Sequence, residues 1–144
     1  MTVGVELTSR GIDVGIVVAD LGRAIAFYRD LLGLADEGEM PMPTGGRMRR
    51  LRCGESLVKL IQPHEPPITD DRERTLTDAA GIRYLTVSVS NLDDLHDELV
   101  DAGIDEVLPP LDIRPGVRIS MLEDPDRNWI ELMQATEPPA ETGA

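Results

Sequence analysis

The sequence predicts an α+β fold in which two βαβββ units form a curved mixed sheet around a central cleft. The main observation is an internal duplication. Residues 12–34 and 82–104 each contain a β-rich run, a polar helix cap, an amphipathic helix and a glycine, and aligning Asp20 with Asn91 gives an offset of 71 residues. The strand-like segments that follow also end alike, in VKLIQ at 58–62 and IELMQ at 130–134. A repeated pattern of this kind indicates a repeated structural unit.

The first unit is expected to begin with a strand over residues 12–19, which are rich in Val and Ile. Asp20 is a good N-cap, and the apolar spacing after it predicts one helix whose stripe contains Tyr28. Gly33 is expected to end that helix in the left-handed conformation. The remaining strands are expected at 34–40, 47–53 and 56–62, with the last two joined as a hairpin at Gly54-Glu55.

The second unit repeats this plan. A strand is expected over 82–89, followed by a helix that is capped by Ser90 or Asn91 and stopped by Gly103. His96 on this helix is expected at the surface. The apolar stripe of the helix is Leu92, Leu95, Leu99 and Ala102, and the later strands are a short one at 105–108 and a final pair at 117–122 and 128–134.

The chain is expected to form one domain overall. Between the two units lies a proline-bearing charged stretch that predicts an irregular connector. The expected parts are a loose N-terminal arm at 1–9, the first unit at 10–63, the connector at 64–80, the second unit at 81–134 and a flexible tail at 135–144.

Composition limits the classes of partner. The net charge is −13, from 27 acidic and 14 basic residues, which disfavours binding to nucleic acid. No apolar run approaches the roughly 20 residues that span a bilayer, and the N-terminus lacks a secretory pattern. The single cysteine, Cys53, fits a reducing compartment. A cytoplasmic protein without membrane or nucleic-acid partners is therefore expected.

The predicted fold has a place for a small organic ligand. A helix covers only one face of each sheet, so the uncovered faces are expected to line a shared cleft. A local basic patch lies on the strands of the first unit. Its side chains can be solvated charges of an edge strand, or one or two can bind an anionic group of the ligand. The patch comprises Arg47, Arg49, Arg50, Arg52 and Lys59.

The motifs DLGRAIAFYRDLLGL, VKLIQP and DPDRNWIEL resemble those of the vicinal oxygen chelate superfamily, over residues 11–134. That superfamily includes glyoxalase I, methylmalonyl-CoA epimerase, extradiol dioxygenases, fosfomycin-resistance enzymes and bleomycin-binding proteins. The resemblance implies the fold, and it leaves the reaction open because one scaffold hosts many chemistries. It also implies a homodimer.

Carried over by position, the metal ligands of this superfamily fall on Asp13, Lys59, Tyr84 and Glu131. The duplication pairs the same residues, since Asp13 plus 71 is Tyr84 and Lys59 plus 72 is Glu131. A lysine ammonium has no lone pair for a metal, and the two histidines, His64 and His96, lie elsewhere. We therefore expect no metal and no other cofactor. The alternative is a hard ion held weakly by Asp13 and Glu131.

Without a metal, Lys59 is expected to supply the positive charge between Asp13 and Glu131, with Tyr84 at the edge of this cluster. The cluster is either a polar plug or acid–base machinery in which Asp13 or Glu131 is the base and Tyr84 or Lys59 stabilises an oxyanion. Further substrate-binding candidates are Arg50, Trp129 and Met121, although Trp129 and Met121 can equally be packing residues.

The sequence therefore predicts a metal-independent small-molecule enzyme that carries out proton transfer of the isomerase, epimerase or lyase type. One alternative is a binding or resistance protein that sequesters its ligand without turnover. Another is a divalent-metal-dependent glyoxalase-like lyase or a dioxygenase. No Ser-His-Asp set, phosphate loop or CxxC motif is present in the sequence.

Overall fold

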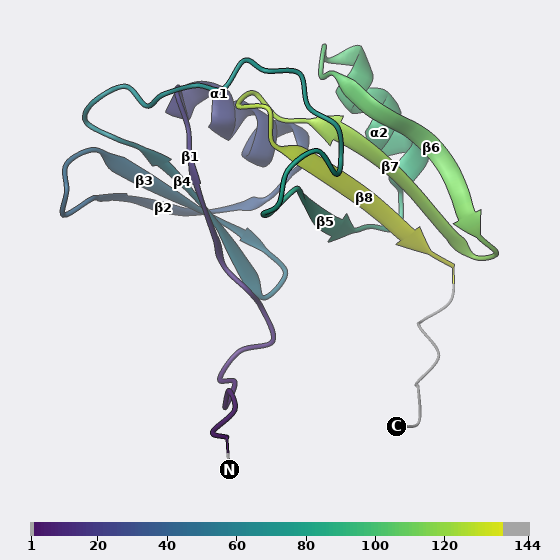
Figure 1. Ribbon diagram of the computed structural model, residues 1–144, viewed down its shortest axis with the longest axis horizontal. Coiled ribbons are helices and arrows are strands. Elements are labelled where there is room, and N and C mark those ends of the chain that lie inside the picture. The colour runs from purple at the N-terminus through teal and green to yellow at the C-terminus, as the bar shows by residue number, and fades with distance from the viewer. Residues whose placement is uncertain (1, 137–144) are drawn as a thin grey trace. The chain divides into compact units, whose positions relative to one another are not determined.

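A computed structural model describes residues 2–136, and the chain divides into two compact units, Met1–Thr69 and Asp70–Ala144 (Figure 1). We call them unit 1 and unit 2. Residues 2–13 contain no helix or strand. Most of the tail expected at 135–144 lies outside the described residues. No helix of the described part is long and apolar enough to cross a membrane.

Unit 1 contains one four-stranded mixed sheet in the order β1-β4-β3-β2. The outer strand β1 runs parallel to β4, and the other neighbours are antiparallel. The predicted hairpin is confirmed, since β3 and β4 are joined at Gly54-Glu55. The elements are β1 (Val14–Val17), α1 (Leu21–Ile25), η1 (Ala26–Leu31), β2 (Ala35–Pro41), β3 (Arg47–Cys53) and β4 (Ser56–Gln62).

The sequence pattern predicted one helix after Asp20. In the structure the helix of unit 1 is not uniformly α-helical. After α1 it widens into the π-helical turn η1, where the Leu32 amide donates to the Phe27 carbonyl over 2.9 Å. This turn brings two adjacent aromatic residues into the core, because Phe27 is 1% exposed and Tyr28 2%. Gly33 ends the helix at φ 79°, as predicted.

Unit 2 repeats the arrangement with the order β5-β8-β7-β6, so the α+β class is confirmed as two separate four-stranded sheets. The edge strand β6 is longer than the predicted 105–108 and includes Pro109 and Pro110. An edge strand tolerates proline because one side of it makes no ladder hydrogen bonds. The elements are β5 (Tyr84–Ser88), α2 (Leu92–Asp101), β6 (Glu106–Arg114), β7 (Val117–Glu123) and β8 (Trp129–Ala135).

The prediction that His96 lies at the surface is wrong. It is 2% exposed on the sheet-facing side of α2, where its Nδ1 lies 2.9 Å from the Ser120 hydroxyl and its Nε2 lies 2.6 Å from Glu106. Both ring nitrogens therefore have partners, which is what allows a polar ring among apolar residues. The sequence pattern could not show these partners because they come from β7 and β6.

One glutamine in each unit joins the last strand to the start of the helix. The Gln62 side-chain oxygen accepts from the Leu21 amide at 2.7 Å, and the Gln134 oxygen accepts from the Leu92 amide at 2.8 Å. Helix starts carry unsatisfied amides, so each contact stabilises a helix end. The predicted N-cap Asp20 also accepts from the Arg23 amide, at 3.2 Å. These contacts explain why VKLIQ and IELMQ end alike.

Candidate functional site

Strand alternation divides each sheet into a face packed on its helix and an opposite face, which we call the open face. On β4, Val58 and Leu60 are buried, with exposures of 8% and 0%, and contact the helix side. Because alternate side chains point to opposite faces, Lys59 lies on the open face of unit 1. In unit 2, buried Ile130 and Leu132 mark the helix side of β8 in the same way, which places Glu131 on the open face.

The open face of unit 1 brings Asp13 and Lys59 together. Their charged groups are 3.9 Å apart, and the side chains are 44% and 37% exposed. Asp13 is also held by the backbone, since its Oδ1 accepts from the Leu57 amide at 2.7 Å. Arg50 is directly opposite Lys59 on the neighbouring strand. Two cations and one carboxylate therefore share this part of the surface.

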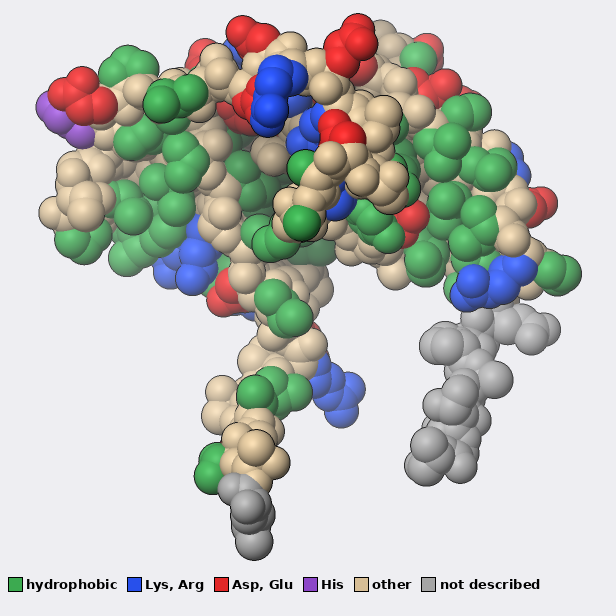
Figure 2. All heavy atoms as spheres, viewed as in Figure 1, with side chains coloured by type: hydrophobic (Ala, Val, Ile, Leu, Met, Phe, Trp, Pro, Cys, Tyr) green, Lys and Arg blue, Asp and Glu red, His purple; other side chains and the backbone are tan. Residues whose placement is uncertain are grey.

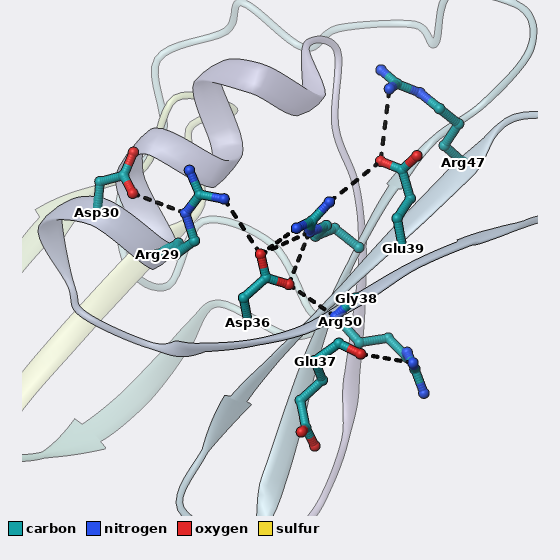
Figure 3. A network of polar contacts seen from close by, with 9 residues as sticks. Arg29, Asp30, Asp36, Glu37, Gly38, Glu39, Arg47 and Arg50 are labelled. Atoms are coloured by element: carbon teal, nitrogen blue, oxygen red, sulfur yellow. Dashed lines mark hydrogen bonds and ion pairs between the residues drawn. The ribbon is translucent and has the colours of Figure 1, made fainter.

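The interpretation of the basic patch as edge-strand charge is wrong, because β3 lies between β4 and β2. Three of its arginines are paired instead with carboxylates of β2, and the fourth, Arg50, donates to the main-chain carbonyl of Glu37 (Figure 3). Arg49 binds Asp36 and Arg52 binds Glu37, the latter at 2.7 Å. Arg47 lies 3.6 Å from Glu39.

Asp36 is the centre of the network in Figure 3. Its carboxylate accepts from Arg49, from Arg29 on the helix at 3.3 Å and from the Gly38 amide at 2.8 Å. The hydrogen bond from Arg49 is the main cause that holds the pKa of Asp36 well below its usual range, with the Gly38 amide and Arg29 contributing. This network fastens β2 and β3 to the helix on the side away from the open face.

The open face of unit 2 carries a buried carboxylate. Glu131 is 8% exposed, and its Oε1 accepts from the Thr86 hydroxyl at 2.9 Å. None of the ion pairs formed by residues 2–136 includes Glu131. Met121, 4% exposed, is paired with it across the ladder, and Tyr84 lies on the same face of β5 with 42% exposure.

Trp129 lies on the same open face and is 7% exposed. Its indole nitrogen donates to Glu123 at 3.1 Å, and the Arg74 guanidinium carbon lies 4.5 Å from the ring centroid. Arg74 was missed by sequence analysis because it belongs to the expected connector. A single arginine in an irregular stretch has no pattern that would mark it in the sequence. Its stacking on the indole is a tertiary contact that only the structure shows.

Arg74 belongs to the first segment of unit 2, residues 70–83, which Arg127 joins to the turn before β8 and Arg83 holds internally; we call this segment the strap. Arg127 donates to the Asp70 and Arg72 carbonyls at 2.9 and 2.8 Å. Arg83 donates to the Thr75 carbonyl at 2.8 Å. Arg127 does so from φ 68°, a conformation that favours glycine, so the turn keeps the geometry of a glycine with a side chain that reaches the strap.

The residues at the four ligand positions do not fit the metal that the resemblance implies. Lys59 offers an ammonium, which repels a cation, and Asp13 is already bonded to the Leu57 amide and lies near Lys59. Nor do residues 2–136 contain a group of three or more His, Cys, Asp or Glu placed to hold a metal. Metal independence stays a prediction.

The four candidates fall into two groups, with Asp13 and Lys59 in unit 1 and Tyr84 and Glu131 in unit 2. Within each unit the two candidates share an open face. A single cluster of all four, which the sequence predicted, would have to join the two units and stays a prediction.

Two other candidate nucleophiles are unsuited to catalysis. Ser120, His96 and Glu106 form a hydrogen-bonded chain, but Ser120 is 0% exposed on the helix side of β7. No substrate reaches a hydroxyl there. Burial raises the pKa of the Cys53 thiol, which disfavours the reactive thiolate.

A family model described as Glyoxalase/Bleomycin resistance protein/Dioxygenase superfamily matches residues 12–132. The Bacillus subtilis protein YwkD, itself uncharacterized, is 28% identical over 123 residues, which cover 84% of this chain and 93% of YwkD.

Solved structures agree in fold. A glyoxalase family protein from Bacillus cereus matches with a TM-score of 0.79 and 20% identity, covering 95% of this chain and 100% of that one. TnmS3, an antibiotic binding protein from Streptomyces sp. CB03234, matches with a TM-score of 0.68 and 22% identity, covering 90% and 98%. At these identities the structural matches show the fold alone.

Proposed function

Because the chain belongs to the glyoxalase/bleomycin resistance protein/dioxygenase superfamily, we propose that it is a metal-independent enzyme that transfers a proton on a small organic molecule. The reaction is of the isomerase, epimerase or lyase type. The observation that supports this is the environment of Glu131, a carboxylate that is 8% exposed, bonded to one hydroxyl and without an ion-pair partner within residues 2–136.

Glu131 is the general base. A carboxylate that accepts a single hydrogen bond keeps lone pairs with which it can take a proton from carbon. Thr86 orients it through the 2.9 Å hydrogen bond. Asp13 is the weaker candidate, because its carboxylate is committed to the Leu57 amide and to Lys59.

The other candidate residues stabilise and position the substrate. Removing a proton next to a carbonyl places negative charge on oxygen, which the Tyr84 hydroxyl, on the same open face as Glu131, neutralises by donating a hydrogen bond. The Lys59 ammonium stays the other donor that the sequence predicted. Met121 and Trp129 present an apolar wall beside Glu131 on the open face of unit 2. Arg50, on unit 1, stays the predicted partner for an anionic group of a ligand.

The test is Glu131→Gln, which keeps the size and polarity of the side chain and removes its basicity. We expect turnover to be abolished while ligand still binds. Exchange of carbon-bound protons in D2O, followed by NMR over a panel of small carbonyl compounds, measures the proton transfer. Glu98→Gln, at an exposed position of α2, is the matched control. Unchanged exchange in the Glu131 variant would exclude this residue as the base.

A ligand-sequestering role without turnover is the second candidate, and the structural similarity to the antibiotic binding protein TnmS3 favours it. The aromatic content argues against it. The chain has one Trp, two Tyr and one Phe, and Phe27 and Tyr28 are buried in the core of unit 1. Only Trp129 and Tyr84 remain to stack on a ligand, whereas a protein that holds a large drug by contact area needs more such surface.

Metal dependence and assembly have direct tests. Elemental analysis of protein purified without chelator is expected to find no stoichiometric metal; zinc, nickel, iron or manganese at one per chain would support the metal-dependent alternative. We also propose a homodimer, and light scattering after size-exclusion chromatography is expected to give twice the chain mass.

A further inference from the structure

Two arginines of this protein carry a guanidinium that the chain leaves partly unsatisfied. Within residues 2–136, the buried side-chain atoms without a hydrogen-bond partner are Nε of Arg50 and Nε of Arg74. In each residue another nitrogen donates to a main-chain carbonyl, that of Glu37 at 2.8 Å and that of Arg83 at 3.0 Å. A buried donor without an acceptor destabilises the folded chain, so each needs a physical explanation.

Among the half-buried arginines of residues 2–136, only these two form no ion pair; Arg10, Arg23 and Arg114 also form none, but they are exposed. No carboxylate of the described residues lies within ion-pair distance of Arg50 or Arg74. A half-buried cation without a counter-ion is unfavourable unless something outside the chain provides the negative charge. The arginines that do form ion pairs are Arg29, Arg47, Arg49, Arg52, Arg72, Arg83, Arg118 and Arg127.

Arg74 is the better placed of the two for recognition. The strap holds it 4.5 Å above the Trp129 ring, and the ring is itself fixed by its 3.1 Å hydrogen bond to Glu123. Stacking occupies one face of the planar guanidinium, and one terminal nitrogen donates to the Arg83 carbonyl, which leaves Nε as a donor without an acceptor. Trp129 shares the open face of β8 with Glu131, so Arg74 covers the strand that carries the proposed base.

We propose that Arg74 is a substrate-binding residue whose guanidinium edge binds a carboxylate of the substrate on the open face of unit 2. This rests on the proposed function and narrows its substrates to small carboxylic acids. A carboxylate matches the planar fork of arginine. A phosphate fits less well, because it carries more charge and more acceptors than one arginine satisfies, in a chain with a net charge of −13.

The strap is then a positioning element. Arg127 fixes the Asp70 and Arg72 carbonyls, so the guanidinium of Arg74 is held in place before the ligand arrives. Less conformational freedom is lost on binding when the recognition group is already ordered.

The probe is pyruvate, with its neutral amide pyruvamide as the matched uncharged ligand. Trp129 is the only tryptophan of the chain, so its fluorescence reports directly on the indole that Arg74 covers. We expect a saturable fluorescence change with pyruvate, and at least tenfold weaker binding of pyruvamide. Arg74→Gln is expected to weaken pyruvate binding at least tenfold and to leave pyruvamide binding unchanged.

Arg72→Gln is the control, because Arg72 lies in the same strap, is 85% exposed and pairs with Asp70 at 2.8 Å. It is expected to bind pyruvate like the unaltered protein. Arg74→Lys keeps the charge but not the planar fork, and is expected to fall between the unaltered protein and Arg74→Gln. Circular dichroism checks that each variant is folded.

The inference is overturned if pyruvate gives no saturable change, if pyruvate and pyruvamide bind alike, or if Arg74→Gln binds pyruvate normally. Its failure is distinguishable from failure of the proposed function. Glu131→Gln is expected to retain pyruvate binding and lose proton exchange. A normal Arg74→Gln beside an inactive Glu131→Gln refutes only the role of Arg74. An active Glu131→Gln beside a binding defect in Arg74→Gln refutes only the proposed base.

Discussion

The two units have the same frame and different polar chemistry. Each has its first strand parallel to its last, and each has a glutamine that binds the first turn of its helix. Between helix and sheet, however, unit 1 has an exposed Arg–Asp network around Asp36, and unit 2 has the buried His96 bonded to Ser120 and Glu106. The arrangement of strands and helix therefore depends on apolar packing and on the contacts at the helix starts. The polar residues between helix and sheet can differ between the units.

The open faces differ in the same way. In unit 1 the candidates form an exposed pair, Asp13 with Lys59, whereas in unit 2 Glu131 is buried at 8% exposure without a counter-ion in the described chain. Acidic and basic side chains lie near one another on the surface in Figure 2, which fits the many exposed ion pairs. An exposed ion pair contributes little to folding stability. A buried carboxylate lowers folding stability and is more often part of a functional site.

The largest effect is expected from equivalent core leucines. Leu60 and Leu132 are both 0% exposed on the helix side of the last strand. Replacing either by alanine leaves a cavity and is expected to cost about 2–5 kcal/mol of unfolding free energy. Urea denaturation measures both. If the two losses of unfolding free energy differ by much more than the error of replicate measurements, the two units are not equivalent in their cores.

The second effect separates the units. His96→Leu removes both ring hydrogen bonds and leaves the buried Ser120 hydroxyl without its partner, at a cost of about 1–3 kcal/mol. The equivalent residue of unit 1, 71 positions earlier, is Ile25, which is already apolar, so Ile25→Leu is expected to change stability far less. Thermal unfolding of the two variants checks this, and equal losses would contradict the role given to the histidine network.

The third effect is expected to be equal in the two units. Gln62→Ala and Gln134→Ala each free one amide at a helix start, and loss of such a cap costs about 0.5–2 kcal/mol. The amides of Leu21 and Leu92 are then expected to exchange faster with solvent. Hydrogen exchange measured by NMR reports on each amide. An unchanged exchange rate in one variant would mean that another acceptor replaces its glutamine.

The smallest effect concerns pH. Asp36 and Asp70 both have their pKa lowered, by Arg49 first in one case and Arg72 in the other. A lowered folded pKa stabilises the protein above the unfolded value of about 3.9, and this contribution is lost as the pH falls below it. Asp36→Asn is expected to flatten the fall of stability below about pH 4.

Asp70→Asn is the matched control for this pH effect. Asp70 binds a residue two positions away, a contact that an unfolded chain can also form, so its replacement is expected to change the acid limb much less. Denaturation at several pH values measures both variants, and equal effects would contradict the assignment to tertiary contacts.

Local signals explain which parts of this protein could be predicted. The hairpin at Gly54-Glu55, the Asp20 cap and the stop at Gly33 follow from turn and capping chemistry within a few residues. The π-turn, the burial of His96 and the stacking of Arg74 depend on partners far away in the chain. At the candidate site, the alternation of side chains along a strand places Lys59 and Glu131 on open faces. Nothing in the sequence indicated that Glu131 is buried.

The glutamine on the last strand of each unit has a consequence for how such a protein can evolve. Each half secures the start of its own helix with its own glutamine. Alternate residues of a strand lie on the open face. Mutations at those positions change the residues that a ligand would contact and leave the residues that pack on the helix unchanged. After duplication of such a unit, one open face can keep its residues while the other changes. New substrates can then be bound without a change in the packing of sheet and helix.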